Sequence, residues 1–439
     1  CDNSIYWGVV SKMMKLKITC FIVLFLMVSV NLLNTDNVSF TQSLEDEETP
    51  KEVILSLNST NIPGFQEGSI FTDSTLSSGN HHTCAILDDG SVSCWGWNDN
   101  GQLGDGTTTD RNTSTQTLSL GTGRTAVAIS SGYRHTCAIL DDGSVSCWGR
   151  NDAGQLGDGT DTERNTPTQT LSLGIGRTAV AISSGNSHSC AILDDASVSC
   201  WGDNGYGQLG DGTNTTRNTP TQTATLGTGR TAVALSSGSA HTCAILDDGS
   251  VSCWGENQYG QLGDGTTTGR NTPTQTSSLG TGRTAVALSS GGWHTCAILN
   301  DGYVSCWGSN GNGRLGDGTD TERNIPTQTS SLGTGRTAVA ISSGGSHTCA
   351  ILDDGSVSCW GDNWKGQLGD GTDTERNTPT QTLSLGIGRT AVAISSGNSH
   401  SCAILDDASV SCWGDNGYGQ LGDGTGGDYS SDYNRNTPT

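Results

Sequence analysis

Short apolar and β-branched runs, each bounded by Gly, Asn, Asp or Ser, recur along most of this chain. One copy of the pattern covers residues 123–132, 135–149, 151–160 and 164–173. Runs this short, interrupted by turn-forming residues, are typical of β-strands rather than of long helices. The pattern predicts about four strands per copy. The middle two form a tight hairpin across Asp141, Asp142 and Gly143.

Paired cysteines show that the pattern repeats with a fixed period. Nine residues separate the two cysteines of a pair, and successive pairs lie 53 residues apart. Seven copies of about four strands favour a closed ring, because closure leaves only short, protected strand edges. We therefore predict an all-β fold, a seven-bladed β-propeller built from seven 53-residue repeats. The pairs are Cys84 and Cys94, Cys137 and Cys147, Cys190 and Cys200, Cys243 and Cys253, Cys296 and Cys306, Cys349 and Cys359, and Cys402 and Cys412.

The three-residue turn also sets the register of the hairpin. It places Cys137 opposite Cys147, so that both sulfurs leave the same face of adjacent strands. We predict a disulfide in every copy. Zinc ligation with His135 and a reduced, purely packing role are the alternatives. In copies three and seven, Ala196 and Ala408 replace the turn glycine, and a positive φ would cost each alanine about 1 kcal/mol.

The region before the repeats has a different composition. Residue 1 is Cys, so we place the start of translation at Met13 or Met14 and interpret residues 1–12 as a reading-frame artefact. Residues 13–33 join a short basic start to an apolar run, which is typical of a signal peptide or a signal anchor. Residues 34–67 form an acidic linker, and residues 68–439 form the propeller. An uncleaved anchor would tether the chain to a membrane through residues 18–33.

Charge and composition narrow the classes of partner. The net charge of −23 opposes binding to the phosphate backbone of nucleic acids. The cysteine pairs and the secretory start together indicate an oxidising compartment, so we expect a secreted or cell-surface protein. We expect a monomer.

Two segments of each copy resemble a known family. Residues 148–159 match Trp-Gly-x-Asn-x-x-Gly-Gln-Leu-Gly-x-Gly, and residues 135–149 match His-Thr-x-Ala-x-x-x-Asp-Gly-x-Val-x-x-Trp-Gly. These motifs resemble the repeats of the regulator of chromosome condensation family, and Arg314 in copy five departs from them at the Gln position. The resemblance covers about residues 71–439 and implies a seven-bladed propeller.

The family resemblance leaves two functions open. Its founding member is a guanine-nucleotide exchange factor for a small GTPase, which acts through a protruding hairpin and binds chromatin. Here the 53-residue spacing leaves no room for such a hairpin, and the only insertion is six residues in the last copy. The chain looks more like secreted bacterial members that use the propeller as a binding platform. We therefore favour a non-enzymatic scaffold that binds a protein or a glycan, with the exchange factor as the alternative.

The few positions that vary between copies are the candidate binding residues. They lie just before the repeated histidine and just after Trp-Gly, where loops are expected, and loops carry recognition on rigid scaffolds. Neutral drift would explain the variation, but it explains less well why aromatic residues are common there. The candidate ligand-binding residues are Trp97, Tyr133, Arg134, Tyr206, Tyr259, Trp293, Trp364 and Tyr418.

The other repeated polar residues suggest structural roles. The seven histidines could line a channel, but burial with a hydrogen bond to a neighbouring backbone group is the simpler interpretation. Asp-Gly loops such as residues 104–107 lack the ligand pattern of an EF-hand and are explained by turn chemistry. No constellation breaks the repeat symmetry as an active site would. We therefore assign no catalytic residue, no metal site and no cofactor.

Overall fold

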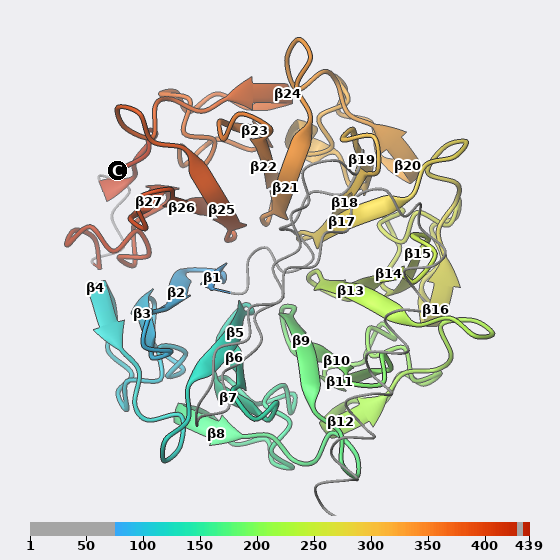
Figure 1. Cartoon of the computed structure of the whole chain (residues 1–439), viewed down its shortest axis with the longest axis vertical. Coiled ribbons are helices and arrows are strands. Elements are labelled where there is room, and N and C mark those ends of the chain that lie inside the picture. The colour runs from blue at the N-terminus through green and yellow to red at the C-terminus, as the bar shows by residue number, and fades with distance from the viewer. Residues whose placement is uncertain (1–74, 428–432) are drawn as a thin grey trace, which may run out of the picture. The chain divides into compact units, whose positions relative to one another are not determined.

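The computed structural model describes residues 75–427 and 433–439, which form a ring of seven antiparallel sheets (Figure 1). This confirms the predicted seven-bladed β-propeller. The expectations for residues 1–67 lie outside the described residues. Among the residues described, no helix is both long and apolar enough to cross a membrane.

We number the blades 1 to 7 in chain order. The strands of each blade are consecutive in the chain, with the first strand nearest the centre of the ring and the last strand at its rim (Figure 1). The innermost strands are β1 (Leu76–Ser78), β5 (Ala126–Ser131), β9 (Ala179–Ser184), β13 (Ala232–Ser237), β17 (Ala285–Ser290), β21 (Ala338–Ser343) and β25 (Ala391–Ser396). The second strands are β2 (His82–Ile86), β6 (His135–Leu140), β10 (His188–Leu193), β14 (His241–Leu246), β18 (His294–Leu299), β22 (His347–Leu352) and β26 (His400–Leu405).

The third strands carry the Trp-Gly motif, and the outermost strands begin at a repeated arginine. The third strands are β3 (Val92–Gly96), β7 (Val145–Gly149), β11 (Val198–Gly202), β15 (Val251–Gly255), β19 (Val304–Gly308), β23 (Val357–Gly361) and β27 (Val410–Gly414). The outer strands are β4 (Arg111–Gln116), β8 (Arg164–Gln169), β12 (Arg217–Gln222), β16 (Arg270–Gln275), β20 (Arg323–Gln328) and β24 (Arg376–Gln381). A short 3-10 helix, η1 (Gly311–Gly313), lies between β19 and β20.

The central hairpin of each blade has the predicted register. Cys137 pairs with Cys147 and Ile139 pairs with Val145, and the same register holds in the other six blades. In all seven blades the two facing cysteines are joined as a disulfide. Ala196 and Ala408 take the expected positive φ, at 61° and 64°.

The apolar core is divided into seven layers, one between each pair of neighbouring blades. Between blades 1 and 2, Cys84 and Cys94 pack with Leu103 from a loop of blade 1 and with Trp148 from blade 2. Leu103 and Trp148 are fully buried, and burial of a leucine side chain stabilises a fold by about 1.5–3 kcal/mol. Each loop therefore helps to hold its own blade against the next one.

Buried histidines link every blade to the following blade. The Nε2 atom of His82 lies 2.9 Å from the hydroxyl of Thr136, and that hydroxyl lies 2.9 Å from the carbonyl oxygen of Gln102. The carbonyl can only accept, so the hydroxyl donates its single proton there and must accept from His82. The Nε2 atom of His82 therefore carries a proton, and burial lowers the pKa of His82 to about 3, which keeps the ring neutral at pH 7. The histidines are buried as expected, but the expected backbone partner was wrong, because the partner is a hydroxyl on the next blade.

Equivalent contacts run around the whole ring and close it. His400 of blade 7 lies 2.9 Å from the hydroxyl of Thr83 in blade 1, which donates to the carbonyl of Gln420. Serines of the innermost strands form a second closed circle, in which the Ser78 amide donates to Ser395 Oγ at 2.9 Å. The last residues add to blade 7, because Thr439 exchanges backbone hydrogen bonds with Cys412 of β27.

We predict that the propeller loses stability as the pH falls below about 6.5. Burial, followed by the charge of His188, lowers the pKa of His135 to about 3 in the folded state, whereas an unfolded histidine titrates near 6.5. The unfolded chain therefore binds more protons across this window, and each such histidine removes about 1.4 kcal/mol of stability per pH unit. Denaturant unfolding at pH 8, 7, 6 and 5 measures the slope. His135→Gln should reduce that slope by about one proton, and an unchanged slope would contradict the prediction.

We also predict that Ala196→Gly stabilises blade 3 by about 0.5–1 kcal/mol, because glycine adopts a positive φ without steric cost. The amide of Ala232 lies 3.2 Å from the Ala196 carbonyl, compared with 2.8 Å at the equivalent Ala179–Gly143 contact. The matched reverse change, Gly143→Ala, should destabilise, because the new Cβ would lie 2.5 Å from Thr178 Cβ. Thermal unfolding of both variants tests the pair, and a destabilising Ala196→Gly would refute the strain argument.

Candidate functional site

Both sets of variable positions lie at the same end of the propeller. In each blade the innermost strand ends, and the second strand begins, at the loop before the histidine. The third strand ends at that same level, because the hairpin strands are antiparallel and His135 pairs with Gly149. We call this end the variable face; in blade 2 it consists of residues 132–134 and 150–163. The Asp-Asp-Gly turns lie at the opposite end.

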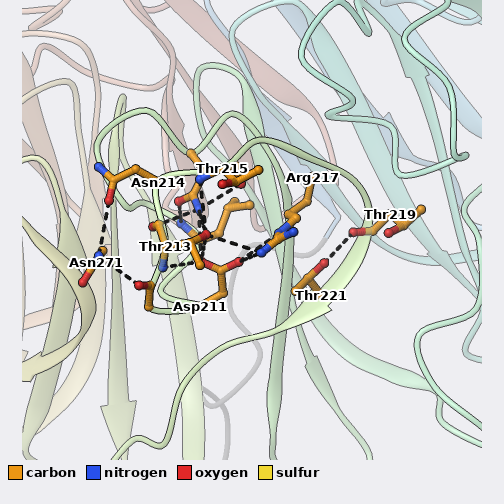
Figure 2. A network of polar contacts seen from close by, with 11 residues as sticks. Asp211, Thr213, Asn214, Thr215, Arg217, Thr219, Thr221 and Asn271 are labelled. Atoms are coloured by element: carbon orange, nitrogen blue, oxygen red, sulfur yellow. Dashed lines mark hydrogen bonds and ion pairs between the residues drawn. The ribbon is translucent and has the colours of Figure 1, made fainter.

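A repeated polar network holds the long loop of each blade in place, and Figure 2 shows the network of blade 3. In blade 3, the Asn204 side chain donates to Asp211 Oδ1 at 3.1 Å and to the carbonyls of Thr213 and Thr215. Arg217 donates to Asp211 Oδ2 through Nε and a terminal nitrogen at 2.9 and 2.8 Å. Burial alone would raise the pKa of Asp211, but the hydrogen bonds from Thr213 and Arg217 outweigh it and lower the pKa. These contacts give the variable residues a rigid support.

The network also accounts for the Asp-Gly loops that suggested a calcium site. The Asp211 carboxylate is occupied by its own loop, and the equivalent Asn–Asp contact occurs in all seven blades. Within residues 75–427 and 433–439, no group of three or more His, Cys, Asp or Glu side chains is arranged to hold a metal ion. Hydrogen bonds within the turn therefore account for the repeated aspartate of these loops.

A cavity of about 450 Å³ opens at the centre of the variable face. Its wall consists of the last serine of each innermost strand, the glycine after it and the next residue, and blades 5 and 6 add one residue more. Two of the predicted ligand-binding residues, Tyr133 and Trp293, contribute to this wall. A rigid, polar ring thus carries a few large side chains that differ from blade to blade.

The structure separates the predicted residues into three groups. Tyr206, Trp293 and Trp364 are exposed, with 56%, 41% and 74% of their surface accessible. Trp97 is only 7% exposed, so most of its ring is covered by neighbouring residues. It is covered because neighbouring loops from blades 7 and 2 close over it. The remaining four are half-buried: Tyr133, Arg134, Tyr259 and Tyr418.

Three blades contribute to one cluster around Trp97. The His81 ring lies 4.6 Å from the Tyr418 ring and 5.9 Å from the Trp97 ring. Trp97 and Tyr418 are 5.3 Å apart, and the Arg134 guanidinium stacks over Trp97 at 4.3 Å. A second contact joins Tyr259 to Trp293 at 6.2 Å. Aromatic and cation–π contacts of these kinds fix the side chains relative to one another.

Asp415 is a functional candidate that the sequence analysis missed. Its carboxylate accepts from Gln420 Nε2 at 2.8 Å and lies 3.5 Å from both His81 Nδ1 and Lys365 Nζ. Burial would raise the pKa of Asp415, but the His81 contact and the Lys365 charge outweigh it and bring the pKa to about 2. Variation at His81 was a signal. The contact with Asp415 could not be recognised from the sequence, because the two residue numbers differ by 334.

Arg314 is a second residue whose role the sequence did not reveal. It replaces a repeated glutamine, and its side chain is buried against the carbonyls of Gly311 and Gly345 at 2.9 and 3.4 Å. Burial lowers the pKa of Arg314. The Gly345 carbonyl belongs to blade 6, so the arginine links two blades beneath the variable face.

The fold and the variable face define a β-propeller of the binding or regulatory class. The RCC1-like domain matches residues 43–385, and the regulator of chromosome condensation (RCC1) repeat matches residues 391–420. The chain therefore belongs to the RCC1-like family. The ultraviolet-B receptor UVR8 of Arabidopsis thaliana is 33% identical over 351 residues, which cover 80% of this chain and 78% of UVR8.

Two further similarities concern parts of larger proteins or the fold alone. The E3 ubiquitin-protein ligase HERC2 of Homo sapiens is 32% identical over 321 residues, which cover 73% of this chain but 7% of HERC2. Prp20p of Saccharomyces cerevisiae, whose structure was described with its binding to Gsp1p and histones, superposes with a TM-score of 0.69 at 21% identity. That match covers 83% of this chain and 87% of Prp20p, and it shows the fold.

We predict that Asn204→Ala destabilises the propeller by about 2 kcal/mol, because the change leaves several buried groups of the loop network without a partner. Asn186→Ala is the matched control, since Asn186 lies on the same face of the same blade but is exposed. Thermal and denaturant unfolding should separate the two variants clearly. Equal stability of both variants would show that the network does not support the loop.

Proposed function

We propose that this protein is a non-enzymatic scaffold that binds a protein or a glycan through the variable face. One observation carries the proposal: the aromatic and arginine side chains at the variable loop positions lie at one end of the ring, and two of them, Tyr133 and Trp293, line its central cavity. Trp, Tyr and Arg are the residue types that dominate binding hot spots. The identical loops beneath them supply a rigid support, which lowers the entropic cost of binding.

We propose that the scaffold works in an oxidising compartment, as a secreted or surface-tethered protein. Support comes from the seven disulfides, which are compatible with an extracellular location. The apolar run within residues 13–33 supports it independently. The acidic chain also disfavours nucleic acid as a partner.

An exchange factor for a small GTPase is the competing function. Prp20p, a protein of the same fold, is described as binding Gsp1p. In the present chain successive cysteine pairs all lie 53 residues apart, so no loop between the first and the last pair is longer than its counterparts. We infer that a protruding exchange hairpin has no place there. Acceleration of GDP release from a panel of small GTPases would contradict the scaffold proposal.

The binding proposal is tested with a triple variant, Tyr206→Ala, Trp293→Ala and Trp364→Ala, whose three side chains are all exposed. The full chain and the variant are compared on a glycan array and by affinity capture from the native environment. We expect the variant to lose its partner, with a drop in affinity of at least about a hundredfold for truncated hot-spot residues. Full retention of every partner would overturn the proposal.

Tyr303→Ala provides the matched control. Tyr303 is also an exposed aromatic, at 47%, but it lies beside the Asp301 turn at the opposite end of the propeller. This variant should bind like the unmodified chain. Equal losses in the triple variant and in Tyr303→Ala would place recognition elsewhere on the propeller.

A further inference from the structure

Each junction between blades brings together three residues on the variable face. The first, which we call the seam residue, directly follows Trp-Gly. The second is the repeated glutamine of the same loop, which Arg314 replaces in blade 5, and the third precedes the histidine of the next blade. At the junction of blades 7 and 1 these are Asp415, Gln420 and His81. The Asp415 carboxylate accepts from Gln420 and lies beside His81 and Lys365. At this junction the carboxylate of Asp415 is therefore surrounded by nitrogen atoms of Gln420, His81 and Lys365.

The junction of blades 3 and 4 uses the same arrangement. Its seam residue is Asp203, and Gln208 Nε2 donates to Asp203 Oδ2 at 2.9 Å. The repeated glutamine is fully buried or nearly so in these blades. Gln208 and Gln420 thus donate to a carboxylate that the chain itself supplies at the seam position. Gln261 and Gln367, whose seam residues are Glu256 and Asp362, have no such partner among the described residues, so the contact is formed at some junctions and not at others.

The junction of blades 1 and 2 has the donors but no carboxylate. Here the seam residue is Trp97, the glutamine is Gln102, and the residue before the histidine is Arg134. Gln102 Nε2, Trp97 Nε1 and Arg134 Nε are all buried and have no hydrogen-bond partner among the described residues. Leaving a buried donor unpaired costs about 1–3 kcal/mol. Three such donors at one junction need a physical explanation.

The three residues converge at this junction. Arg134 stacks over the Trp97 ring at 4.3 Å. A Cβ added to Gly149 would lie 2.5 Å from the Arg134 carbonyl and 3.2 Å from Gln102 Cα, so Arg134 and Gln102 flank the same glycine. In the part of the chain that the structure describes, the Arg134 guanidinium has no carboxylate partner. The neighbouring Arg150 is already paired with Asp152 at 2.5 Å.

We propose that the junction of blades 1 and 2 binds a carboxylate supplied by the partner of the variable face, so this inference rests on the proposed function. Arg134 pairs with the carboxylate through its guanidinium, which suits bidentate contact. Trp97 supports the guanidinium from below, and Gln102 donates as its counterparts do at the other two junctions. Arg134 is half-buried, and its guanidinium lies 5.3 Å from the ring of Tyr133, which lines the cavity.

The experiment follows the indole signals of the full chain, which contains eleven tryptophans, labelled with ¹⁵N. Trp97→Phe assigns the Trp97 signal. The probes are sodium glucuronate, an acidic sugar, and N-acetyl-aspartate amide, an acidic peptide group, each at constant ionic strength. Glucose and N-acetyl-asparagine amide are their uncharged counterparts. We expect both acidic probes to shift the Trp97 signal and to leave that of exposed Trp364 in place. The tighter probe identifies a glycan or a peptide as the source of the carboxylate.

Arg134→Ser tests the role of the guanidinium. Serine stands at this position in three other copies, as Ser187, Ser346 and Ser399, so the loop tolerates it. The variant should weaken binding of the acidic probes by at least about tenfold, as expected for a lost charge-assisted hydrogen bond. Ser187→Ala, the same position at a different junction, should leave binding unchanged. Unaltered binding in Arg134→Ser overturns the proposal.

Trp97→Asp tests the site from the other side, by supplying the carboxylate from the chain itself. This variant should fold, and the rise in melting temperature that the acidic probes give the unmodified chain should disappear. No Trp97 shift with either probe, or equal shifts with the uncharged counterparts, overturns the carboxylate site even if the triple loop variant loses its partner. A carboxylate-specific shift together with a triple variant that retains its partner supports the site and rejects the wider proposal.

Discussion

A hydrogen bond from a buried histidine to a hydroxyl of the next blade is the interaction on which the rest of this structure depends. His82, Thr136 and Gln102 show the unit: the imidazole donates to the hydroxyl, and the hydroxyl donates to a loop carbonyl. All these histidines are fully buried, so water cannot replace a lost partner. The unit therefore sets the position of each blade and, through the carbonyl, the position of the loop that reaches the variable face.

Closure of the ring follows from the same interaction. His400 meets Thr83 across the junction of the two ends of the propeller, with the same geometry as inside the chain. Within each blade, the disulfide and the Asn–Asp–Arg network hold the hairpin and the long loop separately. Because these supports are repeated in every blade, a single loop residue can change without loss of the fold. The asymmetry at Trp97, Arg134 and Asp415 is built on that tolerance.

Local rules were enough to predict the blades. A three-residue turn ending in Gly143 has one natural register, and that register places Cys137 opposite Cys147. The positive φ of Ala196 follows from its place in the same turn. The variable positions could also be assigned to one end of the propeller. Successive loops of an antiparallel sheet alternate between its two ends, so the loop before the histidine and the loop after Trp-Gly lie at the same end. These features depend on residues that are close together in the chain.

The sequence by itself therefore determined the blade count, the hairpin register and the face that carries the variable loops. Only the tertiary structure decided which of those residues are accessible and which meet. Trp97 is buried because loops from blades 7 and 2 cover it, and Asp415 meets His81 only where the ring closes. The physical reason is that contacts between blades depend on the angle at which whole sheets pack, and repetition makes every copy look alike until its neighbours are known.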